Sequence, residues 1–148
     1  MLLSNILFLI LFSFFVAKAE INIEGKNGWA KNLPTWKKKN KFTKIFLGNY
    51  QLTGYHFFMF SSFLLLFHFP FFLGLNWSTS LELKIFALFL FFQLLEDFFW
   101  FILNPSFGLK KFSKKYIPWH KEWAGVIPKA YLKLFFGGLF FLLLSYAL

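Results

Sequence analysis

The sequence predicts an all-α integral membrane protein, a four-helix transmembrane bundle with short interfacial amphipathic helices. Of its 148 residues, 58% are hydrophobic and 15% are charged, whereas a soluble domain is about 45–50% apolar and about 25% charged. Four apolar stretches approach or exceed the roughly 20 residues that a spanning helix needs, and they lie at residues 2–19, 52–75, 83–103 and 126–148. Residues 1–148 are therefore expected to form a single transmembrane domain.

The first stretch, residues 2–19, has two interpretations. Ala17-Lys18-Ala19 has the small-x-small pattern at which a secretory signal peptide is cleaved. However, no Lys or Arg precedes the apolar run, as a signal peptide would require. We favour a retained helix, because the distribution of charge along the rest of the chain needs a span at this position.

The other three stretches are long enough to cross a membrane. Pro70 is expected to kink or end the second of them, because proline lacks a backbone N–H and clashes with the preceding turn. The third carries Gln93, Glu96 and Asp97 within an apolar run, and the fourth has no charge after Lys133.

The lysines predict the topology. The net charge is +10, and the basic residues gather in the loops at 20–51 and 104–125, while the termini and the loop between the second and third spans have few or none. By the positive-inside rule the two basic loops are cytoplasmic and both termini lie outside. Since the lysines flank apolar spans, their partners are expected to be anionic membrane lipids, not nucleic acid.

Both basic loops also carry tryptophan, which favours the headgroup level of a bilayer. Trp29, Leu33 and Trp36 are spaced i, i+4, i+7 in the first loop, and Trp119 and Trp123 lie in the second. Each loop is therefore expected to contain a short amphipathic helix along the cytoplasmic surface, serving as an anchor or as a collar over a site.

The third span carries the residues most suited to chemistry. Acids at the centre of a span cost about 2.5–3.5 kcal/mol each on insertion scales, so they persist where they face a partner, a cavity or water. Gln93, Glu96, Trp100 and Asn104 share one helical face, with Asp97 at its edge. This polar stripe is expected to point into the bundle.

Residues from other segments would meet the stripe at a similar depth. Tyr55 and His56 lie just inside the cytoplasmic start of the second span, and His120 could fold back from the second basic loop. We therefore predict that Glu96 or Asp97 acts as a general acid or base with His56 as partner. The predicted substrate-binding residues are Tyr55, Gln93, Trp100, Asn104 and His120.

Several functions fit this cluster. The leading hypothesis is a small membrane protein that binds a lipid-like or apolar substrate at the cytoplasmic leaflet. In the catalytic form of this hypothesis the protein also transforms that substrate. Two alternatives are an accessory subunit that packs against a membrane protein partner or a second copy, and a proton-coupled or cation carrier. The acids could also pair with neighbours merely to fix helix packing. The absence of Cys excludes thiol chemistry, but a divalent metal remains an alternative, with candidate ligands His56, Glu96, Asp97 and His120.

Overall fold

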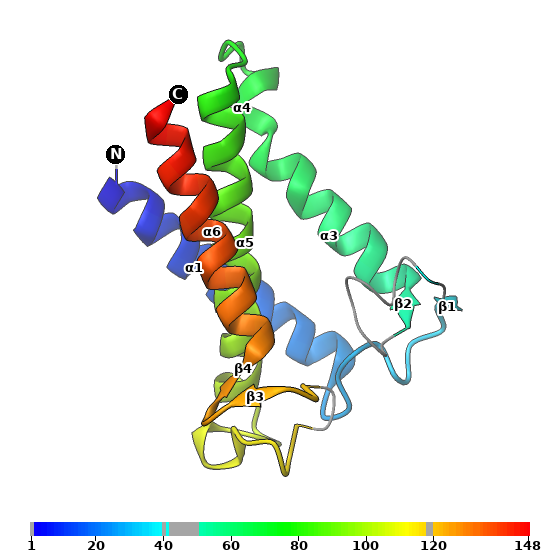
Figure 1. Ribbon diagram of the computed structural model, residues 1–148. Coiled ribbons are helices and arrows are strands. Elements are labelled where there is room, and N and C mark those ends of the chain that lie inside the picture. The colour runs from blue at the N-terminus through cyan, green and yellow to red at the C-terminus, as the bar shows by residue number, and fades with distance from the viewer. Residues whose placement is uncertain (1, 40, 42–50, 118–119) are drawn as a thin grey trace.

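The chain is mostly helical, and its long helices run alternately in opposite directions (Figure 1). The computed structural model describes residues 2–39, 41, 51–117 and 120–148. The elements in chain order are α1 (Leu2–Glu24), β1 (Lys37–Lys38), β2 (Leu52–Thr53), α3 (Gly54–Phe67), α4 (Phe69–Phe72), α5 (Thr79–Leu103), a 3-10 turn (Leu109–Lys111), β3 (Trp123–Ala124), β4 (Ile127–Pro128) and α6 (Lys129–Ala147).

Three helices, α1, α5 and α6, are long and apolar enough to cross a membrane, which indicates a multi-pass membrane protein. The second predicted span differs, because α3 has 14 residues and reaches about 21 Å, short of a hydrocarbon core about 30 Å thick. The helix ends at His68, and α4 restarts with Pro70 in its first turn. The predicted break at Pro70 is confirmed, since proline is tolerated at a helix start but not inside a helix.

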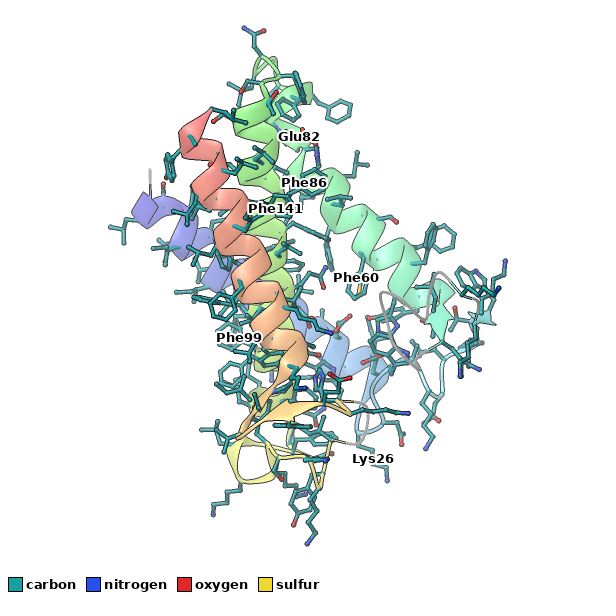
Figure 2. All side chains as sticks on the ribbon, in the orientation of Figure 1. Lys26, Phe60, Glu82, Phe86, Phe99 and Phe141 are labelled. Atoms are coloured by element: carbon teal, nitrogen blue, oxygen red, sulfur yellow. The ribbon has the colours of Figure 1, made fainter. Side chains whose placement is uncertain are left out.

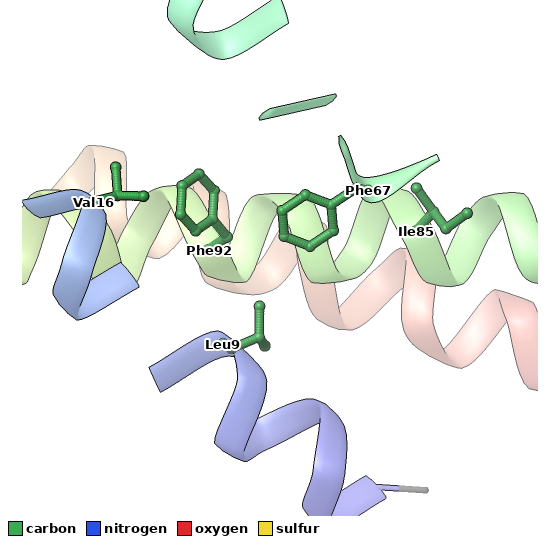
Figure 3. Packing of buried hydrophobic residues seen from close by; sticks show 5 residues of the cluster. All are labelled: Leu9, Val16, Phe67, Ile85 and Phe92. Carbon is green, nitrogen blue, oxygen red and sulfur yellow. The ribbon is translucent and has the colours of Figure 1, made fainter. Parts of the chain in front are cut away.

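Helix α5 is the centre of the bundle, and α1 and α6 pack along it. Leu9 and Val16 from α1 meet Phe92 and Ile85 from α5, with Phe67 of α3 beside them (Figure 3). Helix α3 touches α5 through this C-terminal end and diverges from it toward its N-terminus (Figure 1). The divergence leaves the polar stripe of α5 uncovered by α3.

Helix α1 continues past the predicted boundary at Ala19 to Glu24. Its buried residues recur every three or four positions, as expected for one face of a helix, and they are Leu9, Ser13, Val16, Ala17, Glu20 and Ile21. This face brings two acids, Glu20 and Glu24, to the same end of the bundle as the polar stripe of α5.

The described parts of the basic loops fold differently from the prediction. Residues 25–36 form turns and residues 104–128, apart from 118–119, form turns, one 3-10 turn and a short hairpin, so the predicted interfacial helices are absent from these described residues. In the loop after α1, residues 28–30 have left-handed backbone conformations around the Glu24 carboxylate, which is incompatible with a helix there. Trp119 and residues 42–50 lie outside the described residues.

The described parts of both basic loops lie at one end of the bundle, and the two ends of the chain lie toward the other (Figure 1). This arrangement has the relative topology that the lysine distribution predicts. The side of the membrane that each end faces stays a prediction from the positive-inside rule.

Candidate functional site

A cavity of about 640 Å³ lies between α3 and α6 at the loop end of the bundle, over the polar stripe of α5. Its wall includes five of the six acidic residues and two of the three histidines of the chain. The ionisable lining residues are Glu20, Glu24, His56, Glu96, Asp97, His120, Lys121, Glu122, Lys129, Tyr131 and Lys133. Figure 2 shows Phe60 on the side of α3 that faces this space.

Two deeply buried acids of the cavity are Glu96 of α5 and Glu20 of α1, which are 5% and 6% exposed. Their carboxyl groups face each other, and a hydrogen bond between them would need a proton on one of the two, because two carboxylates have no donor between them. The Tyr55 hydroxyl donates to Glu20 Oε1 at 3.3 Å. Glu96 Oε1 is buried, and no donor among the described residues reaches it.

Asp97 is the centre of a second cluster. Its Oδ2 lies 3.0 Å from His120 Nε2 and accepts a hydrogen bond from the Tyr131 hydroxyl at 2.6 Å. The Asp97 side chain is 35% exposed, more than Glu96 one position earlier, because the two side chains point about 100° apart around the helix. A carboxylate that orients a histidine in this way is a common arrangement for moving a proton.

His56 belongs to a third cluster at the start of α3. Thr53, the N-cap residue, accepts a hydrogen bond from the His56 backbone N–H, and its Oγ1 lies 2.7 Å from His56 Nδ1. His56 Nε2 faces Glu24 Oε1 at 3.6 Å. The Trp29 ring stacks on the imidazole, with centroids 4.3 Å apart. These contacts fix the imidazole orientation from both ring nitrogens and from one face.

The position of α3 itself depends on a close approach at Gly54. Its backbone N–H donates to the Trp36 carbonyl at 2.9 Å, and a Cβ on Gly54 would lie only 2.6 Å from Trp36 Nε1. Beside it, Lys37 and Lys38 of β1 pair with β2. The loop after α1 is thereby fastened to the start of α3, which places His56 beside Glu24.

The structure brings together most of the predicted site residues. His56, Gln93, Glu96, Asp97, Trp100 and His120 all line the cavity, and Tyr55 contacts it through Glu20. His56 pairs with Glu24 instead of Glu96 or Asp97, and His120 takes the place beside Asp97. Asn104 is not among the lining residues, since its side-chain amide donates to the Gly25 carbonyl at 3.0 Å and thereby ties the end of α5 to the end of α1.

The predicted metal ligands divide among separate pairs. Within the part of the chain that the structure describes, no three His, Asp or Glu side chains are grouped so that they could hold a metal ion. Glu96 faces Glu20, Asp97 faces His120, and His56 faces Glu24. This geometry gives the metal alternative no support.

Sequence reasoning missed Glu20, Glu24 and Tyr131. The first two were assigned to a loop, although Ser13, Ala17, Glu20 and Glu24 follow the i, i+4, i+7, i+11 spacing of one helical face. Extending the apolar period of α1 past Ala19 would have found both acids. Tyr131 carried no such signal, because a single tyrosine near a helix start is typical of a membrane interface.

Comparison of the chain with protein-family models, with curated proteins and with solved structures finds no match. The cavity and its side chains are therefore the features of this chain that point to a function.

Proposed function

We propose that the protein binds an amphipathic, lipid-like ligand, with the headgroup among the acids and histidines of the cavity and the apolar chain between α3 and α6. The observation that carries this proposal is the convergence of five acids and two histidines on one wall of a cavity that also has an apolar end. Ligand pockets in proteins typically combine apolar walls with a few convergent polar groups.

The cavity is polarised along the bundle. Phe60, Phe89 and Leu134 line its part nearer the middle of the helices, while the acids and histidines lie nearer the loops. A cavity of about 640 Å³ is within the roughly 300–1,000 Å³ of typical small-molecule pockets. It would hold a headgroup and the first part of a chain, with the remainder in the surrounding lipid.

The Asp97–His120 pair would supply the chemistry in a catalytic version of this function. Asp97 orients the imidazole from Oδ2, and the Tyr131 hydroxyl holds the same oxygen in place. The other ring nitrogen of His120 would then accept or return a proton at a headgroup hydroxyl or amine. Glu96, which the sequence also favoured for this role, would bind the headgroup.

Native mass spectrometry of the protein released from mild detergent tests the proposal. Wild type would be compared with a Glu96→Gln/Asp97→Asn variant and with Glu82→Gln, which makes the same type of change on α5 outside the cavity. We expect a discrete adduct of amphiphile mass on wild type and Glu82→Gln that is absent from the double variant. An apo mass in all three, with equal stability, would contradict ligand binding and favour the accessory-subunit alternative.

A further inference from the structure

The four inner acids of the cavity are Glu20, Glu24, Glu96 and Asp97, and none of them has a lysine partner among the described residues, although three lysines line the same cavity and the chain carries a net charge of +10. In the described residues, the lysine ion pair is between Lys129 and Glu122, with side chains 51% and 65% exposed, and the carboxylates of Glu24 and Asp97 face histidines. The four inner carboxyl groups thus lie together with no described lysine in contact with them.

Glu96 provides a second and independent observation. Its side chain lines the cavity, the residue is 5% exposed, and Oε1 has no hydrogen-bond donor within the part of the chain that the structure describes. A buried carboxyl oxygen without a donor is costly, and native proteins satisfy nearly all such atoms. The missing donor is therefore expected to come from whatever occupies the cavity.

A primary or secondary ammonium satisfies both requirements at once. It brings a positive charge to four carboxyl groups that no described lysine contacts, and its N–H groups are donors with no acceptor capacity. An anionic headgroup would add charge of the wrong sign beside Glu20 and Glu96. A neutral alcohol would donate to Glu96 but bring no positive charge to these carboxyl groups.

We propose that the ligand of this cavity is a cationic amphiphile, a long-chain primary or secondary amine whose ammonium group donates to Glu96 Oε1. This inference rests on the proposed function, since it names the headgroup of the amphiphile. The apolar chain passes Phe60, Phe89 and Leu134, and the ammonium lies between α1 and α5, where Glu20 and Glu96 meet.

Equilibrium binding of radiolabelled dodecylamine and of radiolabelled dodecanol to the full chain in phosphatidylcholine nanodiscs tests this proposal, with empty nanodiscs as background. The two probes share one chain and differ in the headgroup. Because a hydrogen bond to a charged partner is about twice as strong as a neutral one, we expect wild type to bind dodecylamine about tenfold more tightly. Glu96→Gln, and independently Glu20→Gln, should remove this preference while Glu82→Gln retains it.

The outcomes separate the two proposals. If dodecanol binds wild type as tightly as dodecylamine, amphiphile binding stands and the amine assignment is overturned. If the preference for dodecylamine survives in folded Glu96→Gln and Glu20→Gln variants, the assignment to these acids is likewise overturned. If neither probe binds above the empty nanodiscs, the proposed function fails and the amine assignment fails with it.

Discussion

The hydroxyl of Tyr131 offers the sharpest test of the geometry around Asp97. Tyr131 is 7% exposed, and its hydroxyl donates to Asp97 Oδ2 at 2.6 Å. Tyr131→Phe removes this donor and leaves the ring and its packing against Phe112 in place. Tyr146→Phe is a matched control, because it is the same substitution on the same helix at a residue that is 65% exposed.

The structure sets the size of the effect. Interhelical hydrogen bonds in membranes average about 0.6 kcal/mol, while hydrogen bonds to charged groups contribute about 1.5–3 kcal/mol. Asp97 is one-third exposed, so water would replace part of the lost contact. We expect Tyr131→Phe to lower the free energy of unfolding by about 1–1.5 kcal/mol and Tyr146→Phe to change it by less than about 0.5 kcal/mol.

Reversible unfolding in mixed micelles with a rising fraction of a denaturing detergent, followed by circular dichroism, measures both values. Equal effects of the two substitutions would refute the argument that Asp97 is held by Tyr131. The Asp97 carboxylate would then be oriented by His120 alone.

Four further predictions concern the helix contacts, the retention of α1 and the turn after α3. A Cβ on Gly138 would lie 2.9 Å from the Phe91 ring of α5, whereas a Cβ on Gly137 would lie 3.4 Å from the Leu90 side chain. Gly138→Ala should therefore lower the free energy of unfolding more than Gly137→Ala does in the same unfolding assay. Ala17 is fully buried beside α5, so Ala17→Leu should lower the free energy of unfolding by about 1–3 kcal/mol through overpacking. The intact mass of the purified chain should include residues 1–19. A mass that corresponds to a chain starting after residue 19 would contradict the retained helix. Burial by itself would lower the pKa of His68, but its hydrogen bond to the Leu64 carbonyl and its contact with Glu82 at 3.0 Å outweigh this and raise the pKa. The contribution of His68 to stability is therefore fully present below its unfolded pKa of about 6.5, and it is lost as the pH rises through the higher pKa of the folded state. The free energy of unfolding should fall between these two pKa values in wild type and should not do so in His68→Gln.

The spanning helices could be predicted from the sequence because length and hydropathy alone define them. Helix α5 extends to Leu103 and α6 to Ala147, close to the predicted bounds. The limits of α1 and the form of the loops could not be predicted in the same way. In the sequence Glu20 and Glu24 look like the start of a polar loop, whereas in the structure they lie in the last turns of α1 and contact Tyr55 and His56 of α3.

The acids of the candidate site could be predicted from the sequence, but their partners could not. Glu96 and Asp97 are conspicuous because acids are rare inside an apolar span. Their partners come from other segments, and a sequence period cannot tell which histidine reaches which acid. The structure assigns His120 to Asp97 and His56 to Glu24, a pairing set by the turn after α1 and by the fastening of that turn to the start of α3.

The most direct test of ligand binding in the cavity is photo-crosslinking with an amphiphile that carries a diazirine in its chain, followed by mapping of the labelled peptides. Ligand binding in the cavity predicts labels on Phe60, Phe89 and Leu134, which line its apolar part, and the loss of these labels when an excess of the same amphiphile without the diazirine is added. Labelling confined to outward-facing residues such as Phe136 and Phe140, which are 60% and 61% exposed, and unaffected by the competitor, would contradict it.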